Sequence, residues 1–319
     1  MQKSIPALTP TDLFPPPGLR PSLPSQYNFS PCGRYVSYLK GSDTAPNTLD
    51  LWCFDRQQKV HTPIAMALQL DAQADENVTE LNDAERAERE RKRQFTFGIT
   101  RYQWVGELGS LALYADGQAY IKQDIGDDAI IQITPSEKRH SGFNPSPSGG
   151  LISYVRGGNL FYQDTKKAGS EVQVSHDADE CVNYGLPDFL AAEEMHRFAG
   201  AWWSKCERYL IYCRNDEAPV RVSHRMEIDD NGSRTIAQRY PYAGEANPDV
   251  SLHLHDTQSG HSQKIWQSGR TTHDAYLARV LPIADGLCLL TQDRLQQTLV
   301  LSSYEFTTGN WQELYRETS

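Results

Sequence analysis

The sequence is 319 residues long and 39% hydrophobic, which is enough apolar material for a core and excludes a wholly disordered chain. No run reaches the roughly 18 consecutive apolar residues that a membrane-spanning helix needs. The 31 basic and 41 acidic residues give a net charge of −10 at pH 7. Nucleic acid and anionic membranes are therefore poor candidates for partners, because both attract basic patches.

Residues 1–25 do not resemble an export signal, because proline-broken polar sequence follows Lys3 where a signal would have an apolar core. We therefore expect a cytoplasmic protein. The six cysteines form no CxxC pair and have no zinc-like spacing with histidine, so they predict buried thiols in a reducing compartment. These patterns lead us to expect neither a metal site nor a cofactor.

Most of the sequence predicts short strands separated by glycine, proline, asparagine and aspartate. One piece, an aromatic- or serine-led turn with a strand after it, recurs along the chain. Its clearest copies are residues 29–33 before RYVSYLK, 143–149 before GLISYVR and 202–206 before RYLIYCR. Weaker copies lie at 102–104 and 280–286.

A second piece, a strand that ends in an acid, follows each copy of the first. The five acids are Asp55, Asp124, Asp164, Asp256 and Glu305. Aligned on Ser30, Val105, Ser146, Ser204 and Ile283, the units begin 75, 41, 58 and 79 residues apart. The shortest spacing is close to the roughly 40–45 residues of a four-stranded propeller blade. We predict an all-β fold with about five blade-like units of a β-propeller; a sandwich of similar hairpins is the alternative.

Two stretches interrupt the β pattern and predict short inserted helices. Residues 79–93 are helical by composition, with Asn82 as the N-cap and Glu85 completing a capping box. This stretch lacks an apolar stripe, so on its own it is typical of a solvated, ion-paired surface helix. The second stretch is residues 188–198, whose apolar residues predict one side of a helix: Phe189, Leu190, Met195 and Phe198.

Glu193 and Glu194 are the most distinctive pair of side chains. Adjacent helical residues differ in direction by about 100°, so a double glutamate is usually a solvated surface feature. If both carboxylates lean toward one pocket, they offer acceptors for an ammonium group, which donates three hydrogen bonds. A free α-amino group, with a pKa of roughly 7.7–8.0, would be protonated beside them at neutral pH.

Three arginines form the other candidate group. Arg89 and Arg93 lie at i and i+4 on one helix face, whereas Arg91 points elsewhere. An arginine beside two glutamates could keep them ionised and donate to a substrate carbonyl.

The remaining chemistry-bearing residues form no complete catalytic machinery. The sequence contains no Gly-x-Ser-x-Gly elbow, HExxH motif or Walker loop. His253 and His255 share one strand face, but no third metal ligand is indicated beside them.

Residues 185–220, with 238–256 after them, resemble the dipeptidyl peptidase IV family of serine peptidases, in particular its bacterial and cytosolic members. The resemblance rests on Asp188-Phe189 before the acidic pair, the Trp-Trp-Ser strand start at 202–204 and the YPYAGEANP run at 240–248. The N-terminal half agrees, because 29–41 and 47–55 are similar to the family's opening blade. Residues 89–104 resemble its arginine-bearing helix.

The resemblance implies an eight-bladed β-propeller followed by an α/β-hydrolase domain with a Ser-Asp-His triad. It implies that Glu193 and Glu194 bind the substrate's free amino terminus, and that one of Arg89, Arg91 and Arg93 contacts its backbone carbonyl. We expect residues 1–319 to be the N-terminal propeller portion of an enzyme that releases Xaa-Pro or Xaa-Ala dipeptides. On its own this portion should be inactive, because it lacks the nucleophile serine, the aspartate and the histidine.

The expected partners are a peptide with a free N-terminus and the hydrolase domain, on this chain or as a separate one. Whether the chain forms a homo-oligomer stays open. Many bacterial relatives are exported, so the family analogy leaves a periplasmic location open beside the cytoplasm. The alternative function is a non-catalytic propeller module that binds peptides or another protein.

Overall fold

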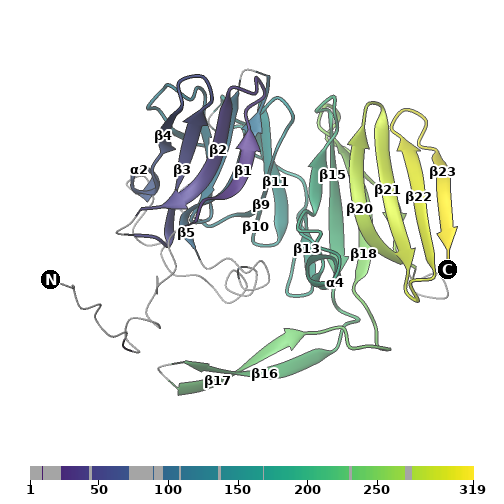
Figure 1. Ribbon diagram of the computed structural model, residues 1–319. Coiled ribbons are helices and arrows are strands. Elements are labelled where there is room, and N and C mark those ends of the chain that lie inside the picture. The colour runs from purple at the N-terminus through teal and green to yellow at the C-terminus, as the bar shows by residue number, and fades with distance from the viewer. Residues whose placement is uncertain are drawn as a thin grey trace. The chain divides into compact units, whose positions relative to one another are not determined.

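The computed structural model describes residues 9, 23–42, 45–71, 89, 96–107, 109–135, 138–167, 169–229, 232–269 and 275–319. The chain divides into two compact units, residues 1–139 and 140–319, and each is considered by itself. Strands dominate both units (Figure 1). The helices of the described part are α2 (Ala67–Asp71) and α4 (Phe189–Glu193), whereas the predicted helix over 79–93 lies outside the described residues except for Arg89, which is helical.

The first unit contains two four-stranded antiparallel sheets. The first sheet comprises β1 (Ser25–Phe29), β2 (Tyr35–Gly41), β3 (Thr48–Asp55) and β4 (Val60–Ala65). The second comprises β5 (Phe97–Val105), β6 (Ser110–Ala115), β7 (Gln118–Lys122) and β8 (Ile131–Gln132). A short parallel pairing of β3 with β5 joins the two sheets into one continuous eight-stranded arrangement. Their shared core contains Leu39 and Leu51 from the first sheet and Ile99 and Leu111 from the second.

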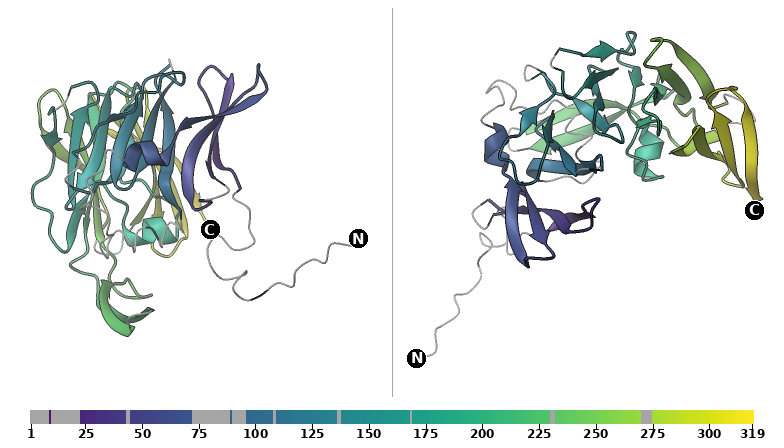
Figure 2. Two further views of the ribbon diagram at one scale, coloured as in Figure 1. Left: turned by 90° about the vertical axis from the view of Figure 1, so that its left-hand side faces the viewer. Right: turned by 90° about the horizontal axis from the view of Figure 1, so that it is seen from above.

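The second unit contains three further sheets and a separate hairpin. The first of these sheets comprises β9 (Ser141–Pro145), β10 (Leu151–Arg156), β11 (Asn159–Asp164) and β12 (Val172–Gln173). The second comprises β13 (Val182–Tyr184), β14 (Ala201–Trp203), β15 (Tyr209–Asp216), β18 (Asp249–Asp256) and β19 (Ser262–Gln267). The third comprises β20 (Ala275–Ile283), β21 (Gly286–Asp293), β22 (Thr298–Glu305) and β23 (Trp311–Thr318), and the hairpin comprises β16 (Val222–Asp229) and β17 (Gly232–Arg239). Figure 2 shows the strands of these sheets running side by side.

These five sheets confirm the five predicted units. Val105 and Ile283 end β5 and β20, and Ser30, Ser146 and Ser204 directly follow β1, β9 and β14. The three serines are buried, and each hydroxyl accepts a hydrogen bond from the backbone N–H five residues later, at 3.0–3.1 Å. The serine therefore closes the turn into the next strand, which explains why the motif recurs.

Two of the acids at strand ends form an ion pair with the arginine that follows the serine-led turn. Arg34 donates to Asp55 at 2.6 Å, and Arg208 donates to Asp256 at 2.6 Å in the sheet that contains β15 and β18. Hydrogen bonds from Arg34 lower the pKa of Asp55 to about 2. The pattern Ser-x-Cys-x-Arg therefore links the start of one strand to the end of its neighbour in two different sheets.

The same turns correct the expectation for the cysteines. All six thiols are free; Cys53 and Cys213 are buried, as predicted, but Cys32 and Cys206 are exposed. The two exposed cysteines lie two residues after Ser30 and Ser204, inside the turn and not in the strand. The apolar residues near them in the sequence lie in the strands that follow, β2 and β15, which are largely buried, whereas the turn itself is not.

Candidate functional site

Helix α4 carries the acidic pair and begins at Asp188. The Asp188 carboxylate accepts a hydrogen bond from the backbone N–H of Ala191 at 3.1 Å, which is an N-cap. Ala191 and Ala192 are buried and fix the inner face of the helix.

The helix is shorter than the sequence predicted. It ends at Glu193, Glu194 is its C-cap, and Met195 and Phe198 lie beyond it. His196 adopts a φ of 51°, in the left-handed region, which an α-helix cannot accommodate. The apolar pattern over 188–198 is therefore shared between a helical turn and the loop that follows.

Glu193 and Glu194 are both exposed. Within the described part of the chain, neither carboxylate has a hydrogen bond or an ion pair. Acidic side chains at the C-terminal end of a helix are unfavourable, because the backbone carbonyls there carry partial negative charge. Helix stability therefore does not explain these two acids, and their position leaves both free to accept hydrogen bonds from a cation.

Arg197, which sequence reasoning missed, holds this element in place. Arg197 is 4% exposed, and its side chain donates to the Asp188 carboxylate at 2.9 Å. Its other nitrogens donate to the carbonyls of Leu277 at 3.0 Å and Ala199 at 2.8 Å. Arg197 therefore ties the start of α4 to strand β20. The only sequence signal was an arginine nine residues after an aspartate.

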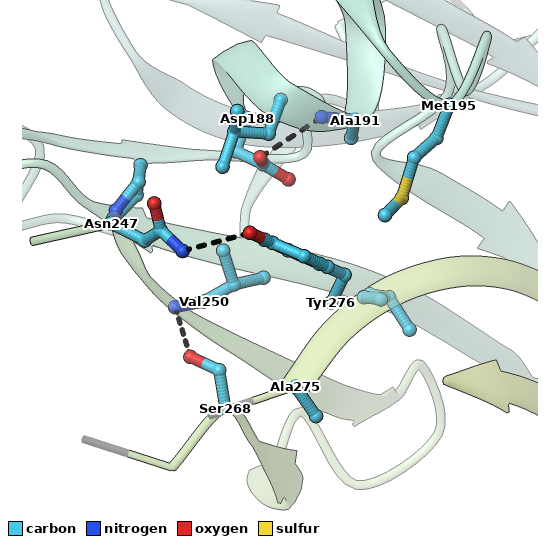
Figure 3. A pocket seen from close by; sticks show the side chains of 11 residues that line it. Asp188, Ala191, Met195, Asn247, Val250, Ser268, Ala275 and Tyr276 are labelled. Atoms are coloured by element: carbon cyan, nitrogen blue, oxygen red, sulfur yellow. Dashed lines mark hydrogen bonds between the residues drawn. The ribbon is translucent and has the colours of Figure 1, made fainter. Parts of the chain in front are cut away.

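A small pocket lies against the inner side of α4 (Figure 3). Leu190, Ala191 and Met195 line it from the helix side. Asn247 and Tyr276 lie across from them, with the Asn247 amide 3.4 Å from the Tyr276 hydroxyl. Neither Glu193 nor Glu194 is among the lining residues, so this pocket and the acidic pair belong to different sides of α4.

The three candidate arginines are only partly described. Arg89 donates to the Thr96 carbonyl at 2.5 Å, and its guanidinium lies 4.9 Å from the centre of the Phe97 ring. Arg91 and Arg93 lie outside the described residues. Because Arg89 belongs to the first unit and the glutamates to the second, their relative placement stays a prediction.

His253 and His255, the weak metal candidates, are engaged within the second unit. His253 lies 3.0 Å from the Ser251 hydroxyl, and His255 lies 2.9 Å from that of Ser262. No three His, Cys, Asp or Glu residues of the described part form a group that could hold a metal ion.

No helix among the described residues is long and apolar enough to cross a membrane.

The comparison with protein families identifies the chain. The model of the dipeptidyl peptidase IV (DPP IV) N-terminal region matches residues 115–319, which is more than half of the sequence. The chain therefore belongs to the dipeptidyl peptidase IV family and contains its N-terminal region. The resemblance carried by the acidic pair, the Trp-Trp-Ser strand start and the Asn-Pro run is confirmed.

Named relatives agree with this result but are much longer. "Probable dipeptidyl-aminopeptidase B" of Podospora anserina is 29% identical over 162 residues, which cover 46% of this chain and 17% of that protein. The same-named protein of Grosmannia clavigera is 30% identical over 175 residues, covering 47% and 18%. "Prolyl endopeptidase FAP" of Bos taurus is 29% identical over 176 residues, covering 52% and 23%. The chain thus matches less than a quarter of the length of these relatives.

A solved structure supports the fold class. The crystal structure of Porphyromonas gingivalis dipeptidyl peptidase 4 superposes with a TM-score of 0.68 at 19% identity, covering 94% of this chain and 40% of that one. The all-β, blade-like architecture predicted from the repeats is confirmed, and the sandwich alternative is set aside.

Proposed function

We propose that this chain is the substrate-recognition part of a DPP IV-like serine exopeptidase, in which Glu193 and Glu194 anchor the free amino terminus of a peptide. The observation that carries the proposal is that both carboxylates are exposed and have no partner among the described residues. The helix that bears them is fixed through Asp188 and Arg197. A protonated α-amino group is the ligand that suits two acceptor-only carboxylates on a rigid support.

In the whole enzyme, the fixed distance between the anchored amine and the nucleophile would place the second peptide bond of the substrate at the nucleophile. A hydrolase domain with a Ser-Asp-His triad would then release Xaa-Pro or Xaa-Ala dipeptides. One of Arg89, Arg91 and Arg93 would donate to the substrate's backbone carbonyl, for which a planar guanidinium is suited. Family membership and the names of the aminopeptidase relatives support this assignment.

The proposal predicts that peptide binding depends on the positive charge of the ligand's amino group and on the negative charges of Glu193 and Glu194. We expect the purified chain to bind glycyl-proline amide and to lose at least about ten-fold in affinity when the ligand is N-acetylated, because acetylation removes the ammonium charge. The double variant E193Q/E194Q should show a similar loss, since charge-assisted hydrogen bonds are about twice as strong as neutral ones. Isothermal titration calorimetry measures both effects.

Glu180→Gln is the matched control, because Glu180 is another exposed acid of the same unit. It should leave the affinity unchanged. Equal binding of the free and the acetylated ligand by the wild-type chain would refute amine anchoring.

A further inference from the structure

Three aromatic rings form a cluster beside the acidic helix: Phe189, Tyr240 and Tyr242. The ring centres of Phe189 and Tyr240 are 5.2 Å apart at 67°, and those of Tyr240 and Tyr242 are 5.0 Å apart at 65°. Both contacts are edge-to-face, an arrangement that aromatic rings favour. Tyr240 and Tyr242 are nevertheless 41% and 42% exposed, so the cluster presents apolar ring surface to solvent.

The cluster lies on the same side of α4 as one of the two acids. Phe189 is the first residue of the helix and Glu193 the last, four positions later. Residues at i and i+4 are neighbours on a helix surface, with roughly 5–6 Å between their Cβ atoms. Helical side chains also lean toward the N-terminus, so the Glu193 side chain leans back toward Phe189. The Glu193 carboxylate and the Phe189 ring of the cluster are thereby about one helical turn apart.

Tyr240 differs from Tyr242 in its polar contacts. The Tyr242 hydroxyl lies 2.8 Å from that of Ser223, and the Arg221 guanidinium covers the Tyr242 ring at 5.4 Å. Arg221 is itself paired with Glu245 at 3.0 Å, which offsets its charge near the acids. The Tyr240 hydroxyl, in contrast, has no hydrogen-bond partner within the described residues.

We propose that Tyr240, supported by Phe189 and Tyr242, is a stacking platform for an aromatic or large apolar side chain on the first residue of a bound peptide. The inference rests on the proposed function, because it assumes that the acidic pair holds the peptide's ammonium group. The first side chain and the ammonium are attached to the same carbon atom. An ammonium held at Glu193 therefore brings that side chain within about one helical turn of the carboxylate, and Phe189 of the cluster lies one turn back along the helix.

The platform predicts selectivity for the first residue of the peptide. We expect the chain to bind phenylalanyl-proline amide about five-fold more tightly than glycyl-proline amide, since a ring pair adds a modest gain beyond the area it buries. Tyr240→Ser should abolish this preference and leave glycyl-proline affinity within about two-fold. Tyr240→Phe should retain it, because stacking needs the ring and not the hydroxyl.

Calorimetry on the purified chain, with folding checked by circular dichroism, measures the two affinities. Tyr315→Ser is the control, because Tyr315 is an exposed tyrosine of β23 in the same unit and should not affect the ratio. If Tyr240→Ser keeps the preference, the platform is wrong. If it weakens both ligands equally, Tyr240 contacts the ammonium instead, and the platform is again wrong while amine anchoring survives. Failure of the folded wild-type chain to bind either free amine would overturn both proposals.

Discussion

At the residue scale, His253 shows how burial changes the chemistry of a side chain that looked like a metal ligand. Its ring stacks on Tyr212, with centres 5.3 Å apart and planes at 20°. Burial, with a smaller contribution from Arg214 and Lys264, lowers the pKa of His253 from 6.5 to about 4. The imidazole is therefore a neutral member of the sheet at physiological pH.

This shift predicts a loss of stability on acidification. Between pH 6.5 and pH 4, His253 is protonated in the unfolded chain but stays neutral in the folded chain. The free energy of unfolding therefore falls as the pH falls through this window. Above pH 6.5 both states are neutral at this position and the effect disappears. We expect His253→Gln to reduce the difference in stability between pH 7.5 and pH 4.5 by about 2 kcal/mol.

Urea unfolding at the two pH values measures this difference. His224→Gln, at an exposed histidine of the β16–β17 hairpin, is the control. An unchanged pH dependence in His253→Gln would show that other groups carry the acid sensitivity.

At the element scale, α4 is too short to be stable alone, because isolated helices below roughly 12 residues are marginal in water. Its position depends instead on the buried pair of Asp188 and Arg197, whose side chains are 8% and 3% exposed. Removing one partner of a buried ion pair leaves an uncompensated charge in a poorly solvated place.

We therefore expect Arg197→Met to lower the free energy of unfolding by about 3–5 kcal/mol. Arg208→Met, which breaks the more exposed pair with Asp256, should cost much less, because solvent screens that interaction. Denaturant unfolding of the two variants provides the comparison. Similar losses in both would mean that the Asp188–Arg197 pair has no special role in holding α4.

At the scale of the whole molecule, the last sheet presents an open edge. Strand β23 pairs with β22 on one side, and no other described residue pairs with it. Its Leu314 and Tyr315 are 49% and 58% exposed. An unpaired edge with apolar side chains is a template for association with another strand.

We expect the purified chain to self-associate in a concentration-dependent way through this edge. Leu314→Lys should shift it toward monomer, because a charge on an edge strand opposes strand pairing. Sedimentation velocity measures the change. Leu295→Lys is the control, since Leu295 is exposed in the turn between β21 and β22. A wild-type chain that stays monomeric at high concentration would count against the open-edge interpretation.

The sequence alone determined the repeating architecture, because three of the five blade-like sheets use the same local chemistry. A buried serine closes the turn and an acid ends the strand, so Ser30 and Ser204 could be aligned without any structure. The sequence also located Glu193 and Glu194, through motifs that resemble the family. These features depend on residues close together in the chain.

Only the tertiary structure decided what holds and surrounds the acidic pair. The contact of Arg197 with the Leu277 carbonyl joins residues 80 positions apart, and that of Phe189 with Tyr240 spans the whole β16–β17 hairpin. The apolar periodicity predicted a helix that reached residue 198, because a sequence pattern does not reveal the left-handed backbone conformation at His196. Local patterns report which face of an element is apolar, but the partner of a buried charge or an open ring depends on how distant strands pack.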